Sequence, residues 1–297
     1  MHAGQLTVSP ETVRALVDAQ FPRLRGELVR PVVSQGTANA IFRVGQHFAA
    51  RFPLEPEDPA LTRGRLESEA AAARELLGRT RFRTPEPIGL GEPGAGYPLT
   101  WSVQTWVPGT VAEGPVDAAF AADLAEFIHG VRSIDPRGRT FRGGDRTGRG
   151  GELWVHDEWM QTCLRNSEGL LDVGRLRPMW TAMRALPRGP EADLMTHGDL
   201  IPGNLLVSGG RLSGVIDVGW LGPADPAVDL VVAWHLLDPW PHQVLRDALG
   251  CGPQEWARGR AWAFQQAMGL VWYYVDSNPG MSLLGRRTLE RIMAEPG

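Results

Sequence analysis

One stretch of this sequence constrains the fold more than any other: the run HGDLIPGN at residues 197–204 and the apolar segments that follow it. The apolar segments are separated by Gly209-Gly210, and the second of them ends at Asp217. A pair of glycines between two apolar runs predicts a tight β-hairpin. Such a hairpin would bring Asn204, before its first strand, close to Asp217, after its second, with Asp199 just upstream.

These three side chains offer only oxygen atoms to a ligand. Carboxylate and amide oxygens suit Mg²⁺ rather than zinc, and Mg²⁺ held by few protein groups is characteristically completed by substrate phosphates. The two carboxylates and the amide together therefore form a candidate Mg²⁺ site.

Phosphoryl transfer needs a base on the accepting hydroxyl, a metal ion across the phosphates and a cation that grips them. In the protein-kinase catalytic loop a metal-binding Asn follows the Asp by five residues, and a metal-binding Asp comes further on. Asn204 follows Asp199 by five residues, and Asp217 lies thirteen residues beyond Asn204. The alternative is a capped turn at Asp199 and a strand-ending turn at Asp217. We expect His197 to pack and orient this loop rather than to take part in chemistry.

The rest of the chain divides into an α+β part and a mostly helical part. The first part predicts helices from Ser9 and over 61–77, and strands at 31–33, 40–44, 47–52, 86–90 and 99–106. Beyond Pro108-Gly109 the pattern predicts helices from Asp117 and over 153–165, 173–186, 226–237, 254–275 and 281–293. The expected division is 1–104 as a first lobe, 105–110 as a hinge and 111–297 as a second lobe.

The sequence contains no lysine, and all 30 of its basic residues are arginine. A cation that grips phosphates must therefore be an arginine. Arg51 lies on a predicted strand, facing away from the apolar Phe48, Ala50 and Phe52. Glu69 falls on the apolar face of the following helix and needs a partner there. We expect Arg51 and Glu69 to pair; the alternative is a Glu69 that faces solvent at the helix edge.

HGDLIPGN, together with IDVG at 216–219 and DPAVDL at 225–230, resembles the aminoglycoside phosphotransferase family, antibiotic kinases with a protein-kinase-like fold. The resemblance runs from the loop at 34–39 to residues 273–279. It implies a bilobal α+β fold, with an antiparallel sheet and a helix in the small N-terminal lobe and a larger, mostly helical C-terminal lobe. It implies that Asp199 is the catalytic base and that Asn204 and Asp217 bind Mg²⁺.

By the same resemblance, ATP or GTP is the phosphoryl donor and binds in the first lobe. The expected nucleotide contacts come from the Arg51 and Glu69 pair, from a phosphate loop and from the backbone around the adenine. The loop and backbone residues are Ser34, Gly36, Thr37, Asn39, Gln104 and Trp106. An ordinary hairpin loop would look like the segment 34–39. In DPAVDL we expect Asp225 to cap a helix and Asp229 to point back toward the catalytic loop, both in structural roles.

The acceptor implied by the resemblance is a small hydroxylated molecule, with an aminoglycoside first. Val218 and Trp220 depart from the family's usual IDFGD, which leaves room for a more apolar acceptor such as a macrolide. The candidate acceptor contacts are Asp157, Glu158, Trp220 and Asp276, although each of the three acids would also suit a plain surface position. Two further alternatives stay open: a metabolic kinase of the same family that acts on an amino alcohol or a sugar, and a nucleotide-binding module without turnover.

The composition of the chain limits the classes of partner and the types of site it can have. A net charge of -4 speaks against a nucleic-acid binder. The two cysteines cannot build a disulfide framework or a structural zinc site. The first residues lack a signal-peptide pattern, and no apolar run is long enough to span a bilayer. We expect a cytoplasmic enzyme, a monomer or weak dimer, whose partners are a nucleotide and a small molecule.

Overall fold

The computed structural model describes residues 5–32, 38–143, 148–189 and 192–295 of the 297-residue chain. These residues form two compact units. The first comprises the described parts of Met1–Leu77, Arg83–Pro108 and Val215–Gly219, and the second those of Gly78–Phe82, Gly109–Gly214 and Trp220–Gly297. Within the described ranges, no helix combines the length and apolarity that crossing a membrane requires.

The first unit is built on a five-stranded antiparallel sheet of order β1-β2-β3-β5-β4. Its strands are β1 (Val29–Val32), β2 (Asn39–Val44), β3 (Phe48–Pro53), β4 (Pro87–Gly91) and β5 (Trp101–Thr105). Side chains alternate between the two faces of each strand. Phe52 therefore joins the apolar core, in which its ring stacks on Trp101 at 4.8 Å, while Arg51 points to the opposite face.

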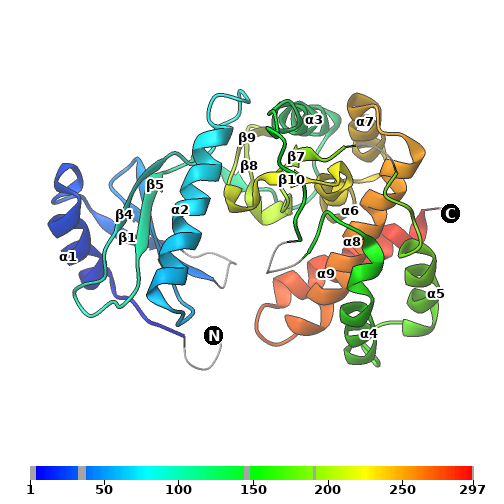
Figure 1. Ribbon diagram of the computed structural model, residues 1–297, viewed down its shortest axis with the longest axis horizontal. Helices are drawn as coiled ribbons and strands as arrows, with labels where there is room; N and C mark the ends of the chain where they lie inside the picture. The colour runs from blue at the N-terminus through cyan, green and yellow to red at the C-terminus, as the bar shows by residue number, and fades with distance from the viewer. Residues whose placement is uncertain (1–4, 33–37, 144–147, 190–191, 296–297) are drawn as a thin grey trace. The chain divides into compact units, whose positions relative to one another are not determined.

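Two long helices lie on opposite sides of this sheet (Figure 1). They are α1 (Pro10–Gln20) and α2 (Pro59–Leu76). A short 3₁₀ helix, η1 (Pro22–Leu24), follows α1. Ser9 caps α1 as predicted, because its hydroxyl accepts a hydrogen bond from the Thr12 backbone N–H at 3.2 Å. The apolar stripe of α1 packs into the sheet core, and α2 contacts β4 and β5.

The second unit holds two small sheets. One has the order β6-β8-β9 and contains β6 (Thr110–Val111), β8 (Leu205–Ser208) and β9 (Arg211–Val215). The hairpin between β8 and β9 is the predicted one, and Gly209 and Gly210 have the positive φ values, 58° and 78°, that its tight turn requires. The other sheet pairs β7 (Leu194–Thr196) with β10 (Gly222–Ala224) in antiparallel fashion.

Helices make up most of the second unit, and the long α8 contacts α4, α5, α6 and α9. The α-helices are α3 (Ala118–Arg132), α4 (Asp157–Asn166), α5 (Val173–Met183), α6 (Val231–Leu236), α7 (Pro239–Leu249), α8 (Pro253–Tyr273) and α9 (Pro279–Ala294). The 3₁₀ helices are η2 (Leu153–His156), η3 (Pro202–Asn204), η4 (Val218–Trp220) and η5 (Pro226–Leu230). α8 is the centre of the unit because residues around most of its circumference are buried.

The predicted α+β class, with an antiparallel sheet early in the chain and mostly helices later, is confirmed. Three local predictions need correction. The helix expected over 226–237 is a 3₁₀ turn, η5, followed by the short α-helix α6. The helix expected over 153–165 likewise begins as the 3₁₀ turn η2, and α4 starts only at Asp157. The helix α7 was not predicted.

Candidate functional site

The run 197–204 forms a loop that leads from β7 through η3 into β8. Two of its polar residues, Asp199 and Asn204, contact each other directly. The Asn204 side-chain amide donates from Nδ2 to the Asp199 carbonyl oxygen at 2.9 Å and to Asp199 Oδ2 at 3.0 Å. Asn204 is 8% exposed, so this contact fixes both side chains in one place. Since Nδ2 is occupied, the amide presents its oxygen, Oδ1, to any ligand.

The other carboxylate oxygen of Asp199 has two further donors. Arg149 approaches Oδ1 with Nη2 at 3.2 Å, and Gln266 donates from Nε2 to the same oxygen at 3.3 Å. The Asp199 and Arg149 side chains are 14% and 11% exposed. Both donors were missed in the sequence, because they lie 50 and 67 residues from Asp199 and no local spacing connects them.

A buried carboxylate holds the backbone of this loop. Asp229, in η5, accepts hydrogen bonds from the N–H groups of His197 and Gly198, each at 2.8 Å. Asp229 is 0% exposed, and burial raises the pKa of its carboxyl above the usual value, against the opposing effect of these contacts. The expectation that Asp229 points back toward the loop is confirmed. His197 is also 0% exposed and packs edge-on against Phe127, as a structural role requires.

Gly198 is needed where it stands. Its φ of +81° lies in the region that favours glycine, and a Cβ there would lie 3.1 Å from Trp220 Cβ. The loop can therefore follow Trp220 closely only with glycine at this position.

The helix cap expected at Asp225 forms within a larger buried network. The Asp225 side chain accepts from the Ala227 N–H at 3.0 Å and from Arg258 Nε at 2.7 Å. Arg258, in α8, also donates to the carbonyl oxygens of Leu186 and Gly151, each at 2.8 Å. Arg258 thus ties η5, and with it Asp229, to the central helix.

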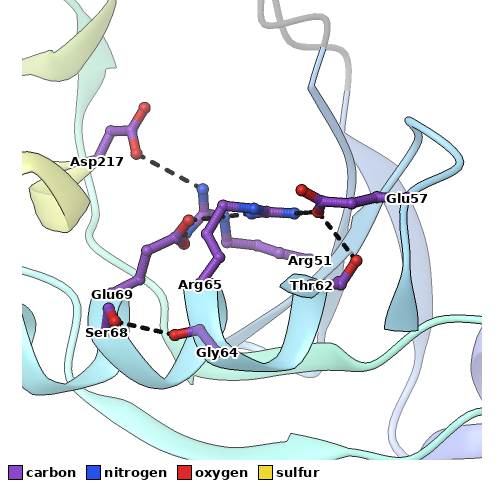
Figure 2. Close-up of polar contacts among 8 residues, drawn as sticks. All are labelled: Arg51, Glu57, Thr62, Gly64, Arg65, Ser68, Glu69 and Asp217. Carbon is purple, nitrogen blue, oxygen red and sulfur yellow. Dashed lines mark hydrogen bonds and ion pairs between the residues drawn. The ribbon is translucent and has the colours of Figure 1, made fainter. Parts of the chain in front are cut away.

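A second group of site residues gathers in the first unit (Figure 2). Arg51, on β3, donates from Nη1 to Glu69 Oε2 at 3.2 Å, so the predicted pair forms. Its Nη2 lies 3.6 Å from Asp217 Oδ1. One guanidinium therefore contacts two carboxylates from distant parts of the chain, as its planar fork allows.

Figure 2 shows that Glu69 is held from its other side as well. Arg65, one turn earlier on α2, contacts Glu69 Oε1 at 3.1 Å and Glu57 Oε2 at 3.5 Å. Thr62 donates its hydroxyl to the same Glu57 oxygen at 3.0 Å. The Arg51 guanidinium thus faces a carboxylate that has little freedom to turn away.

The backbone around Asp217 has unusual geometry. Asp217 has a φ of +59°, which non-glycine residues rarely adopt and which costs on the order of 1 kcal/mol or more. Two residues on, a Cβ at Gly219 would lie 2.7 Å from Glu69 Cγ. Glycine therefore allows this segment to lie against α2, and the strained residue is the one predicted to bind metal.

The donor atoms fit Mg²⁺ with few protein ligands. Among the described residues, no group of three or more His, Cys, Asp or Glu side chains could hold a metal ion. The available donors are Asn204 Oδ1 and the Asp217 carboxylate, which are hard oxygen ligands. Asn204 lies in the second unit and Asp217 in the first, and either oxygen ligand alone would leave most coordination positions of a Mg²⁺ ion to water and phosphate oxygens.

The other predicted nucleotide contacts are only partly described. Ser34, Gly36 and Thr37 lie outside the described residues, and Asn39 begins β2 opposite Pro53. Gln104 lines a cavity of about 30 Å³ together with the Arg51, Glu69 and Asp217 cluster. The Trp106 N–H donates to the His47 carbonyl oxygen at 2.7 Å, so that N–H is committed to the sheet.

The candidate acceptor residues are not brought together. Asp157 accepts from Trp180 Nε1 at 2.9 Å and pairs with Arg184 at 2.8 Å, which gives it a structural role. Glu158 and Asp276 are exposed. Trp220 lines a cavity of about 470 Å³ in the second unit. The described lining of this cavity includes the apolar Phe141, Pro223, Ala224 and Val228, the arginines Arg139, Arg142 and Arg149, and Gly198 of the loop.

Comparison with known proteins places this geometry in a family. The model of the phosphotransferase enzyme family matches residues 30–262. An aminoglycoside 3'-phosphotransferase of Streptomyces fradiae is 33% identical over 217 residues, which is 65% of this chain and 73% of that protein.

Solved structures of similar fold include the GDP complex of aminoglycoside 2'-phosphotransferase-IIIa, with a TM-score of 0.70 and 18% identity over 97% of this chain and 99% of that one. They also include a macrolide 2'-phosphotransferase from Brachybacterium faecium, with a TM-score of 0.62 and 17% identity over 95% and 99%. The fold is accordingly the bilobal, protein-kinase-like one of these enzymes. The chain belongs to the phosphotransferase enzyme family and is a phosphotransferase that uses an alcohol group as acceptor.

Proposed function

We propose that this enzyme transfers the γ-phosphoryl group of ATP or GTP, with Mg²⁺, to a hydroxyl of an aminoglycoside, and so acts as an antibiotic resistance kinase. The observation that carries the reaction is the Asp199 carboxylate, held by Asn204 on one oxygen and by Arg149 and Gln266 on the other. The acceptor class follows from the relative in Streptomyces fradiae, which is named as an aminoglycoside 3'-phosphotransferase.

Asp199 is the proposed base. In phosphoryl transfer the protein mainly positions the reactants, and the base orients the accepting hydroxyl and takes its proton. The fixed carboxylate suits this role, because its contacts with Asn204 and Gln266 set the direction in which it can meet a hydroxyl.

Asn204 and Asp217 are the proposed Mg²⁺ ligands. The metal ion, when bound, neutralises the charge of the phosphates. Arg51 is the proposed phosphate-gripping cation, and Glu69 orients it through the 3.2 Å contact. In this assignment residues 1–104 are the nucleotide-binding lobe, 105–110 the hinge and 111–297 the catalytic and acceptor-binding lobe. The base of the nucleotide meets the backbone near Gln104 and Trp106, where Trp106 offers its carbonyl oxygen since its N–H is occupied.

A macrolide is the second candidate acceptor. The observation that favours it is the cavity of about 470 Å³ next to Gly198, whose described lining combines Trp220 and Phe141 with three arginines. Arginine side chains repel a polycation, whereas aromatic rings favour an apolar surface. A solved macrolide phosphotransferase shares the fold.

The test is nucleoside diphosphate release by the purified protein with Mg²⁺ and ATP or GTP, against aminoglycosides, macrolides and small amino alcohols or sugars. Asp199→Asn should lower turnover by about 10²–10⁴ while nucleotide still binds. Asp247→Asn, an exposed aspartate of α7 outside the site, is the matched control and should retain full turnover.

Each outcome assigns one function. Stimulation by aminoglycosides supports the proposal, stimulation by macrolides alone supports the second candidate, and stimulation by amino alcohols or sugars alone identifies a metabolic kinase. Nucleotide binding with no stimulation of release by any of these acceptors would overturn both antibiotic proposals and point to an acceptor outside the panel. Equal turnover by Asp199→Asn and the parent protein overturns the assignment of the base.

A further inference from the structure

We propose that Gln266, oriented by the buried His235, is a positioning residue that fixes the direction of the Asp199 carboxylate. This inference rests on the proposed role of Asp199 as the base. Gln266 and His235 come from α8 and α6, helices that contact each other and both contact α9 (Figure 1). Neither residue belongs to the motifs that identified the site.

The contacts form a continuous chain. Gln266 Nε2 lies 3.3 Å from Asp199 Oδ1, and Gln266 Oε1 lies 2.9 Å from His235 Nε2. On the other side of the ring, His235 Nδ1 lies 2.8 Å from the hydroxyl of Thr288. Thr288 is 0% exposed and His235 is 2% exposed, so water does not compete for the contact between them.

Hydrogen-bond chemistry gives the chain a direction. An ionised carboxylate can only accept, so Gln266 must present its amide N–H groups to Asp199 and its oxygen to His235. His235 must then carry a proton on Nε2. Burial lowers the pKa of His235 to about 4, so the ring is neutral at pH 7 and its Nδ1 is an acceptor. A hydroxyl has one proton to donate, so the Thr288 hydroxyl must direct it to His235 Nδ1 instead of to the Leu284 carbonyl oxygen, which also lies 2.8 Å away.

The consequence concerns orientation. A glutamine amide without a fixed partner can turn over and present its oxygen to the carboxylate, which repels it. His235 prevents this, because its Nε2–H pairs only with the Gln266 oxygen. Arg149 donates to the same Asp199 oxygen, but it comes from a loop, whereas Gln266 comes from the central helix of the unit. Of the two donors to Asp199 Oδ1, Gln266 is therefore the one whose backbone is held in a helix.

The first experiment reads the tautomer directly and needs no turnover. In the ¹⁵N-labelled full chain at pH 7, the ring nitrogens of His235 should show a proton on Nε2 and none on Nδ1. His235→Gln serves for assignment of the signals. A proton on Nδ1 and none on Nε2 would reverse the direction of these hydrogen bonds and overturn the inference.

The second experiment uses the acceptor and nucleotide with the highest kcat/KM in the panel described above. Gln266→Met should lower kcat by about 10–100-fold and leave both KM values within about twofold. His235→Leu should lower kcat in the same way, and His235→Gln, which restores an N–H donor toward Gln266, should recover most of it. The control is Gln265→Met, a neighbouring buried glutamine on α8 whose Nε2 faces His156 instead; it should retain kcat.

The double variant Gln266→Met/His235→Leu separates positioning from general damage. If His235 acts through Gln266, the double variant loses no more kcat than Gln266→Met alone. Additive losses, a change in KM rather than kcat, or an unchanged kcat in Gln266→Met would each overturn the inference. If no acceptor in the panel is phosphorylated, the proposed function fails, and the tautomer measurement alone decides whether the hydrogen-bond chain exists.

Discussion

Replacing Arg258 by Met should destabilise the protein more than any change to a surface arginine. Arg258 is 1% exposed and lies on α8. Its guanidinium pairs with Asp225 at 2.7 Å and donates to two carbonyl oxygens, those of Leu186 and Gly151. Methionine fills the apolar part of the space but restores none of these hydrogen bonds.

The loss in free energy of unfolding can be worked out from the buried groups that Arg258→Met leaves without a partner. The Asp225 carboxylate, 4% exposed, would keep its contacts with the Ala227 N–H and Trp262 Nε1 but would lose its only described charged partner. Removing one member of a buried ion pair costs about 3–5 kcal/mol. The Gly151 carbonyl oxygen, also buried, adds about 1 kcal/mol. We expect a loss of about 4–6 kcal/mol, or a fall in Tm of roughly 8–24 °C at about 2–4 °C per kcal/mol.

Urea denaturation followed by tryptophan fluorescence measures this loss. The matched control is Arg287→Met, an exposed arginine on α9, which should change the free energy of unfolding by less than about 0.5 kcal/mol. Adding Asp225→Asn to Arg258→Met should recover part of the stability, because the unpaired buried charge is then gone. The reasoning is refuted if Arg258→Met is no less stable than the control.

Two further predictions concern the nucleotide and pH. Glu69→Gln removes the charge that orients Arg51, so the KM for nucleotide should rise about tenfold while the KM for acceptor stays unchanged. The control is Glu67→Gln, on the exposed side of α2. Equal changes in both KM values of Glu69→Gln would contradict this role of Glu69. His235 has a pKa of about 4 in the folded protein against 6.5 without burial, so below pH 6.5 the unfolded chain binds a proton that the folded protein does not take up until about pH 4. The free energy of unfolding should therefore fall by up to roughly 3 kcal/mol as pH drops through this window, and urea titrations of His235→Gln should lack this component; identical pH slopes for the two proteins would show that His235 is not the cause.

The parts of the site that could be predicted from the sequence are of two kinds. Some residues lie close together in the sequence, and others had only one type of partner available in this chain. Asp199 and Asn204 lie five residues apart, and the Asn204 side chain donates directly to the Asp199 carboxylate. The Arg51 and Glu69 pair could be predicted because the chain has no lysine and because a carboxylate on an apolar helix face needs a partner. Contacts of these kinds can be predicted from hydrophobic periodicity and from the need of a buried charge for a partner.

The parts that were missed depend on packing between distant segments. Arg149 and Gln266 reach Asp199 only because the fold brings a loop and α8 to the same place, and nothing near them in the sequence indicates it. The helix α7 was missed for a different reason. Pro239 and Pro241 look like helix breakers, but both lie in its first turn, where the backbone N–H that proline lacks has no partner within the helix.

The two aspartates of DPAVDL explain why the catalytic loop needs the rest of the second unit. Asp229 holds the loop by the N–H groups of His197 and Gly198, but a buried carboxylate can do so only if its own position is fixed. Asp225 fixes it, since it caps η5 at one end and binds Arg258 of α8 at the other. α8 also carries Gln266, which contacts Asp199 directly. The backbone of the loop and the side chain of its aspartate are therefore positioned by the same helix. A change that shifts α8 should misplace both together, so that kcat falls before the nucleotide is lost.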